Sequence, residues 1–252
     1  MNICPLLNTN IQKNNQEALD LNAKKCKEYF INNIPKKEII TDNEGNTYEG
    51  YFKNNKLTGN VVHTFSNGNQ YRGDFVEGIR HGKGIIEYTN GESYEGDWVN
   101  NKRHGRGLMI CANGNIYKGD FFDDILNGYG LLIFANGDKY EGNFKNGQYH
   151  GKGIFKFANN DKYEGDWVDN KRSGRGIHTD IYGNKYEGEF INDKYNGAGI
   201  FTYANGDQYD GVFINGKQVD GVFIINSIND KMEVSGIIDL IEIGSDEEFK
   251  EV

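Results

Sequence analysis

The stretch Tyr94-Glu95-Gly96-Asp97-Trp98 decides the fold, because its pattern returns every 23 residues along most of the chain. Glycine follows the leading tyrosine two residues later in each of eight units, without insertion or deletion. A fixed period of this length is typical of repeat architectures, in which each unit contacts mainly its neighbours. The leading tyrosines are Tyr48, Tyr71, Tyr94, Tyr117, Tyr140, Tyr163, Tyr186 and Tyr209.

Within one unit, Tyr94, Gly96 and Trp98 alternate with Glu95 and Asp97, which predicts a strand with aromatic rings on one face and acids on the other. The polar stretch 100–105 predicts a loop, and the apolar stretch 107–111 a second short strand. Asn113-Gly114 then predicts a two-residue hairpin turn of type I′, which requires positive φ at both positions.

These elements predict an all-β chain: an open, single-ribbon solenoid of antiparallel β-hairpins, with about eight repeats over residues 45–216. Because paired strands lie about 4.8 Å apart, each repeat advances the ribbon by about 10 Å. Glycine between two aromatic residues leaves room for rings from adjacent units. The predicted aromatic ladder comprises Tyr71, Phe75, Tyr94, Trp98, Tyr117, Phe121, Tyr140, Phe144, Tyr163, Trp167, Tyr186, Phe190, Tyr209 and Phe213.

Two stretches, Tyr163-Glu164-Gly165-Asp166-Trp167 and Ala135-Asn136-Gly137-Asp138-Lys139-Tyr140-Glu141-Gly142, resemble the membrane occupation and recognition nexus (MORN) repeat. Departures are local, as at Thr58-Gly59-Asn60, Asn127-Gly128 and residues 218–221. The resemblance implies either repeats attached to a kinase or methyltransferase, or repeats that stand alone as scaffolds. The flanks are too short for a catalytic domain, so the resemblance favours the stand-alone type.

The N-terminal segment, residues 1–44, contains an expected amphipathic helix over about 15–33, with Leu19, Ala23, Cys26 and Phe30 on one face and Pro35 after it. Such a helix can cover the open edge of the first hairpin, as terminal repeats require. The alternative is a separate helix that binds a partner.

Residues 217–243 predict irregular strands that cap the ribbon, at 221–225 and 234–241. A dimer contact is the alternative for these strands, so the chain is expected to be a monomer or a homodimer. The end of the chain, 244–252, is an acidic tail.

A net charge of -9 argues against nucleic acid as a partner, because nucleic acid attracts a positive surface. The three cysteines, Cys4, Cys26 and Cys111, are too scattered for a disulfide framework. The first residues do not have the pattern of a signal peptide. We expect a cytoplasmic location, and association with a membrane or the cytoskeleton is compatible with it.

None of the candidate catalytic or metal-binding groups has the spacing that such a site requires. We therefore expect a chain that is not an enzyme and binds no cofactor or metal. His81, His104 and His150 occupy the same position in different repeats, about 10 Å or more apart, whereas ligands of one zinc ion lie about 2 Å from it. His63 and His178 share another position. Fragments such as Gly82-Lys83-Gly84 resemble phosphate loops, but no helix follows them. The acids of the first strand recur as a solvated ladder.

One charge pattern predicts a binding surface. Nine basic residues fall in the predicted hairpin loop, so they should line one edge of the ribbon while acids line its face. This edge either serves solubility or binds anions such as acidic protein or lipid headgroups. The nine are Arg80, Lys83, Lys102, Arg103, Arg106, Lys152, Lys171, Arg172 and Arg175.

The leading functional hypothesis is a cytoplasmic scaffold that binds a protein partner, a peptide or a helix, along the curved aromatic face. The first alternative is weak peripheral binding to anionic phospholipid, such as phosphoinositide, through the basic edge. The second alternative is an accessory module for a separate enzyme.

Overall fold

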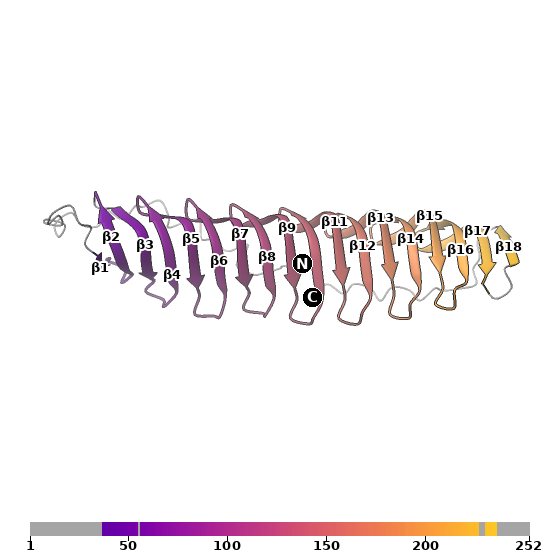
Figure 1. Ribbon diagram of the computed structural model, residues 1–252, viewed down its shortest axis with the longest axis horizontal. Helices are drawn as coiled ribbons and strands as arrows, with labels where there is room; N and C mark the ends of the chain where they lie inside the picture. Colours follow the sequence, from indigo (N-terminus) through magenta and orange to yellow (C-terminus); the bar gives the residue numbers. More distant parts are fainter. Residues whose placement is uncertain (1–36, 55, 227–229, 236–252) are drawn as a thin grey trace. The chain divides into compact units, whose positions relative to one another are not determined.

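The computed structural model describes residues 37–54, 56–226 and 230–235, which divide into two compact units meeting at Gly128 and Tyr129. Within each unit, consecutive strands pair antiparallel in chain order (Figure 1). These ranges contain no helix, and hence none with the length and hydrophobicity that a membrane crossing requires. The predicted helix over 15–33 and the acidic tail 244–252 lie outside the described residues.

The strands alternate between seven and nine residues in length through the repeats. The first unit contains β1 (Lys37–Thr41), β2 (Thr47–Lys53), β3 (Lys56–Thr64), β4 (Gln70–Val76), β5 (Ile79–Glu87), β6 (Ser93–Val99), β7 (Lys102–Ile110) and β8 (Ile116–Phe122). Strand β9 (Ile125–Ile133) crosses the boundary between the units. The second unit continues with β10 (Lys139–Lys145), β11 (Gln148–Lys156), β12 (Lys162–Val168), β13 (Lys171–Thr179), β14 (Lys185–Ile191), β15 (Lys194–Thr202), β16 (Gln208–Ile214), β17 (Lys217–Ile225) and β18 (Asp230–Ser235).

The turn inside each repeat is shorter than expected. Asn100 and Asn101, with φ of 51° and 65°, join β6 to β7, and Val99 pairs directly with Lys102. Two positive φ values in a two-residue loop are the mark of a type I′ turn. The predicted loop over 100–105 was therefore wrong, because asparagine tolerates the left-handed region and lets the second strand begin at Lys102.

The turn between repeats also differs from the expected type. Gly114 has a φ of 86°, whereas Asn113 is not among the residues with positive φ. The Cys111 amide N–H donates to the Asn115 carbonyl at 2.8 Å, and the Gly114 N–H donates to the Cys111 carbonyl at 2.9 Å. This is a three-residue hairpin loop with glycine in the left-handed position, so the predicted type I′ turn at Asn113-Gly114 was wrong.

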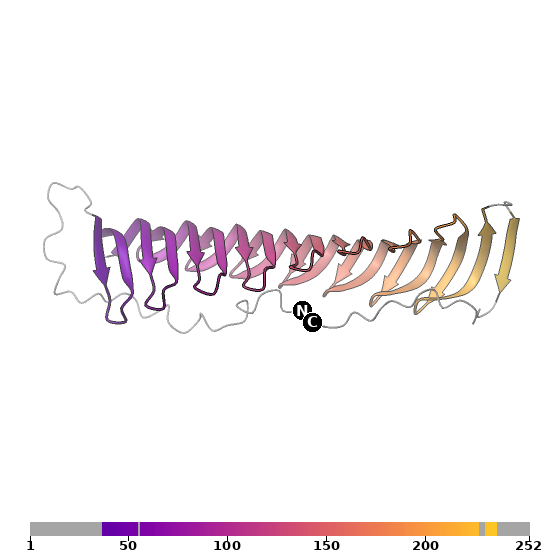
Figure 2. The ribbon, with the colours of Figure 1, turned by 90° about the horizontal axis from the view of Figure 1, so that it is seen from below.

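The aromatic ladder forms the core of both units. All fourteen predicted side chains are at most 5% exposed. Tyr71 packs edge to face on Phe75 of its own strand, with ring centroids 5.5 Å apart, and on Trp98 of the next repeat, at 5.2 Å. A single sheet can bury one face in this way because its strands curve, as the orange strands of the second unit show in Figure 2.

The close approach of strands at the core requires glycine. Gly165 and Gly176 face each other across β12 and β13, and the Tyr163 ring lies over both. A Cβ on Gly176 would lie 2.5 Å from the Tyr163 hydroxyl and 2.6 Å from its Cζ. A Cβ on Gly165, which follows the leading Tyr163, would likewise lie 2.5 Å from Gly176 Cα and from the Tyr163 hydroxyl, so both glycines are packing requirements.

The two ends of the described chain are more regular than predicted. β18 begins at Asp230, four residues before the predicted strand at 234–241, whose residues 236–241 lie outside the described residues. The N-terminal segment contributes strand β1, which pairs with β2 along its whole length. β17 is a regular nine-residue strand that begins four residues before the predicted 221–225 and pairs with β16 around a register shift at Val212/Phe213. Gly221 follows its partner Gly211 by 10 residues, whereas Gly176 follows its partner Gly165 by 11, so the eighth repeat is one residue shorter within its hairpin.

Candidate functional site

The predicted basic edge lies on strands, and its residues fall into different environments. Lys83, for example, lies in β5, and Arg106 lies in β7. Residues at the tenth position of the repeat, counting the leading tyrosine as the first, point into the core. Residues at the thirteenth position point to the opposite face.

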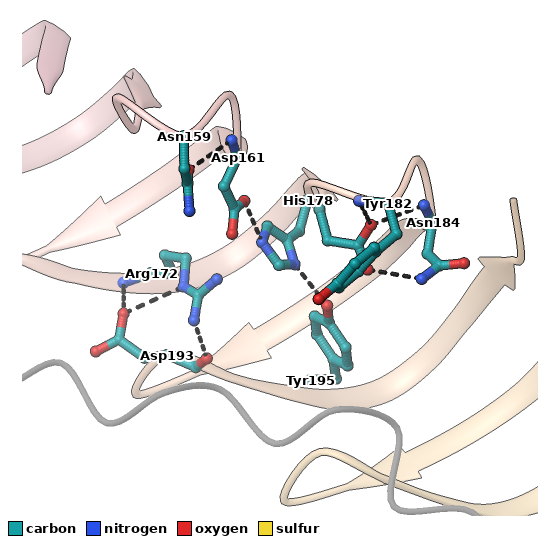
Figure 3. Close-up of polar contacts among 9 residues, drawn as sticks. Asn159, Asp161, Arg172, His178, Tyr182, Asn184, Asp193 and Tyr195 are labelled. Carbon is teal, nitrogen blue, oxygen red and sulfur yellow. Dashed lines mark hydrogen bonds and ion pairs between the residues drawn. The ribbon is translucent and has the colours of Figure 1, made fainter. Parts of the chain in front are cut away.

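Arg103 and Arg172 are core residues. Arg103 is 9% exposed and its guanidinium carbon lies 5.8 Å from the Tyr94 ring and 5.7 Å from the Phe121 ring. Its Nε donates to Asp124 Oδ1 at 2.9 Å. Arg172 repeats the arrangement with Asp193 in the second unit, where Nη2 also donates to the Asp193 carbonyl at 2.8 Å (Figure 3). Burial and ion pairing keep both guanidinium groups from forming an exposed basic edge.

Four of the more exposed basic residues lie next to acids of neighbouring strands or turns. Charge is therefore interleaved on this face, and the expectation of a segregated basic edge was wrong. Of the nine predicted residues, only Lys171 and Arg175 are exposed cations with no carboxylate within 4 Å in the described parts of the chain. The ion pairs are Lys83–Asp97 at 2.5 Å, Lys152–Asp166 at 2.7 Å, Lys102–Asp123 at 3.1 Å and Arg106–Asp120 at 3.7 Å.

Arg80 occupies the same repeat position as Arg103 and Arg172 but forms no ion pair with a carboxylate of the described residues. It is 8% exposed and stacks on the Trp98 ring at 4.6 Å and on the Tyr71 ring at 5.4 Å. The Arg80 amide N–H donates to Asn101 Oδ1 at 2.8 Å, and its Nε donates to the same oxygen at 3.4 Å. Burial lowers the pKa of Arg80 below its ordinary value. A neutral amide thus takes the place of a carboxylate.

His63 lies beside Arg80 in the first unit. Its ring stacks on Tyr48 with centroids 4.2 Å apart and lies 3.8 Å from the Phe65 ring. The side chain is 8% exposed, and its Nε2 has no hydrogen-bond partner. Burial, aided by the positive charge of Arg80, lowers the pKa of His63 to about 4, so the ring is neutral at pH 7.

The equivalent histidine of the second unit has both nitrogens occupied. His178 Nε2 lies 2.7 Å from Asp161 Oδ1, and Nδ1 lies 2.6 Å from the Tyr195 hydroxyl (Figure 3). Asp161 precedes His178 by 17 residues and Tyr195 follows it by 17, so Asn46 and Arg80 are their counterparts around His63. One histidine position therefore has a satisfied form and an unsatisfied form in the same chain.

Lowering the pH should destabilise the folded chain through the buried, neutral His63. The folded pKa of about 4 lies below the unfolded value of about 6.5, so unfolding takes up a proton and stability falls as pH drops through this window. We expect the His63→Phe variant to lose about 2 kcal/mol less stability than the parent chain between pH 7 and pH 5. Urea unfolding at the two pH values measures this. Equal losses in both chains would contradict the burial of a neutral His63.

Apolar side chains are exposed in a row on the face opposite the core. At the sixth repeat position of the second unit, Val168 is 47% exposed, Ile191 54% and Ile214 52%. Each pairs across its hairpin with an exposed lysine, and none of these lysines has a carboxylate within 4 Å in the described residues. The apolar–lysine row therefore comprises Val168, Ile191 and Ile214 with Lys171, Lys194 and Lys217.

The remaining histidines are not brought together. His104 Nδ1 lies 3.4 Å from Asp123 Oδ1, and His150 Nδ1 lies 3.5 Å from Asp169 Oδ1. No group of three or more His, Cys, Asp or Glu side chains suited to a metal ion occurs within the described ranges. Sequence reasoning placed Arg80 on an exposed edge and gave His63 only a shared repeat position, and it missed the apolar–lysine row. The signal for Arg80 was Asn101 at a position where two other repeats have aspartate.

Comparison with known proteins identifies the repeats. A family model described as MORN repeat matches seven consecutive segments, at 48–70, 71–93, 94–116, 117–139, 140–162, 163–180 and 186–208. Together they cover more than half of the chain. No curated protein matches this sequence.

Solved structures offer distant likenesses. The TCP domain of SAS-4 (dCPAP) from Drosophila melanogaster, in complex with a proline-rich motif of Ana2 (dSTIL), is 17% identical, with 72% of this chain and 93% of that chain covered and a TM-score of 0.37. The TCP10 domain of CPAP from Danio rerio is 12% identical, with coverage of 71% and 98% and a TM-score of 0.31. Virginiamycin B lyase from Staphylococcus aureus is 13% identical, with coverage of 78% and 68% and a TM-score of 0.16. TM-scores this low do not establish a shared fold.

Proposed function

Because this chain belongs to the MORN repeat family, whose repeats generally serve as interaction modules, we propose that it is a non-catalytic scaffold for a protein partner. The apolar–lysine row is the observation that carries the proposal. Apolar side chains about half exposed at three successive repeats, beside unpaired lysines, are an unusual surface for a chain with a net charge of -9.

The proposed surface replaces the curved aromatic face of the sequence hypothesis. The ladder tyrosines are at most 1% exposed from Tyr71 to Tyr209, so a partner cannot touch their rings without unfolding the repeat. The ladder holds the repeats together, and the strand residues on the opposite face remain free for contact. Ion pairing on that face also weakens the case for binding to anionic phospholipid.

The spacing of the row favours a helical partner. Successive repeats place equivalent residues about 10 Å apart, because two strand spacings of about 4.8 Å separate them. An α-helix rises 1.5 Å per residue, so apolar side chains seven residues apart lie about 10.5 Å apart along it. A helix with apolar residues at this interval and acidic residues beside them would match Ile191, Lys194 and their equivalents.

Site-specific photo-crosslinking tests the proposal. A photoreactive amino acid at Ile191 should capture a discrete protein in the cells that make this chain, through a helical segment with apolar and acidic residues. The same probe at Glu187, on the same face of the same strand, should not. Capture through a segment of other character, or equal capture at both positions, would contradict the proposed surface.

Two triple charge-reversal variants, one in the row and one outside it, test the role of the lysines. Changing Lys171, Lys194 and Lys217 to glutamate should reduce capture at Ile191 at least tenfold. The same change at Lys139, Lys162 and Lys185, at the other end of the strands in the same unit, should leave capture within twofold. A similar loss in both triple variants would show that net charge, and not the row, governs binding.

A further inference from the structure

Three repeats have a buried arginine at the tenth position. In two of them an aspartate accepts a hydrogen bond from the guanidinium group, and in the third an asparagine does. The residue 21 positions later is aspartate for Arg103 and Arg172 and accepts hydrogen bonds from both the backbone and the guanidinium group. Asn101 takes that place for Arg80 and supplies only a neutral oxygen. A buried cation without a compensating anion is costly, so Arg80 marks an incomplete site.

The terminal nitrogens of Arg80 are available to a ligand. Within the described residues, the Arg80 side chain donates only from Nε, to Asn101 Oδ1, whereas Arg103 and Arg172 each also donate from Nη2 to a backbone carbonyl. The neighbouring carboxylate of Asp124 already serves Arg103. The Nη groups of Arg80 therefore have no hydrogen-bond acceptor in the described part of the chain.

His63 supplies a second unsatisfied group, and it precedes Arg80 by 17 residues, as His178 precedes Tyr195, whose hydroxyl it contacts. Its Nε2 is buried without a hydrogen-bond partner, and the ring lies close enough to Arg80 to feel its charge. In the tautomer that carries the proton on Nε2, the neutral ring can donate one hydrogen bond. Two buried groups that can donate, and that form no such hydrogen bond within the described residues, point to an anionic ligand.

We propose that Arg80 and His63 form a binding site for a carboxylate, supplied by an acidic side chain of a protein partner. This inference rests on the proposed function only in assigning the carboxylate to a protein. The choice of carboxylate follows from the chain itself, because aspartate completes the equivalent position at Arg103. Aspartate also completes the equivalent positions at Arg172 and at His178 (Figure 3). One monovalent anion also matches one arginine beside a neutral histidine.

A titration of the full chain with sodium acetate, followed by NMR of the histidine Hε1 protons, tests the site without any partner. At constant ionic strength and pH 7, the His63 signal should shift in a saturable way. His178 serves as the internal control and should not shift, because Asp161 and Tyr195 occupy its nitrogens. No shift at His63, or equal shifts at both histidines, would overturn the proposal.

The Asn101→Asp variant turns the open site into the closed form of Arg103 and Arg172. We expect its acetate affinity to fall at least tenfold while the chain remains folded, because aspartate already occupies this turn position in two other repeats. Asn170→Asp is the matched control, since Asn170 occupies the same turn position but caps the Tyr149 amide. Its acetate affinity should stay within twofold of the parent chain.

Three further outcomes would overturn the assignment. Unchanged acetate binding in Asn101→Asp would show that Arg80 is not the anchor, and an equal loss in Asn170→Asp would show a general charge effect. Inorganic phosphate that binds at His63 more tightly than acetate would replace the carboxylate by a phosphate ligand. Because the titration uses acetate alone, its result is independent of crosslinking at Ile191, and either proposal can fail without the other.

Discussion

Replacing Trp167 by alanine is expected to lower the free energy of unfolding by about 3–5 kcal/mol, as truncation of a buried aromatic side chain generally does. Trp167 is 5% exposed, packs edge to face on Tyr163 and Tyr140, and donates from Nε1 to the Gly153 carbonyl at 3.2 Å. Its removal opens a cavity and leaves a backbone acceptor unpaired. Trp98→Ala should cost a similar amount, and it also removes the ring on which Arg80 stacks.

Chemical denaturation followed by circular dichroism measures this loss. Val168→Ala is the matched control, because Val168 is the next residue on the same strand, faces away from the core and is 47% exposed. It should change stability by less than about 1 kcal/mol. A loss below about 1 kcal/mol for Trp167→Ala would show that the ladder does not form the core.

The second large effect is expected from the addition of a single methyl group. Gly176→Ala should destabilise the chain by about 1–3 kcal/mol or more, because a Cβ there cannot avoid the Tyr163 ring. That ring is fully buried, and its hydroxyl donates to the Asp166 carbonyl at 2.9 Å, so it has no free space into which to move. The backbone of Gly176 itself is not in the left-handed region, so the cost is steric.

Thermal unfolding of Gly176→Ala and Arg175→Ala distinguishes a steric clash in the core from the effect of alanine on strand propensity. Arg175 precedes Gly176 on β13 and is exposed, so alanine there removes an outward side chain and leaves the core unchanged. We expect a clear drop in the midpoint temperature for Gly176→Ala and a small change for Arg175→Ala. Equal midpoints would mean that the tyrosine ladder tolerates expansion.

The outcome at the turns illustrates the limit of local sequence patterns. Asn113-Gly114 and Asn100-Asn101 are both adequate for a type I′ turn by residue type alone. The strand register decides which pair forms the type I′ turn. Pairing of Val99 with Lys102 leaves Asn100 and Asn101 as a two-residue loop. The loop after Cys111 has three residues and needs only one glycine in the left-handed region. Register depends on which faces are buried, and that is a property of the assembled sheet.

The sequence by itself determined the repeat family, the all-β fold and the members of the aromatic ladder, because a 23-residue period with alternating side chains constrains the same contacts many times over. Only the tertiary structure decided the environment of the charges. Arg80 and Lys83 are three residues apart, but the strand places Arg80 in the core and Lys83 beside Asp97. The pairing of Arg103 with Asp124, and the lack of such an acid for Arg80, arise between adjacent repeats, where curvature of the sheet brings distant residues together.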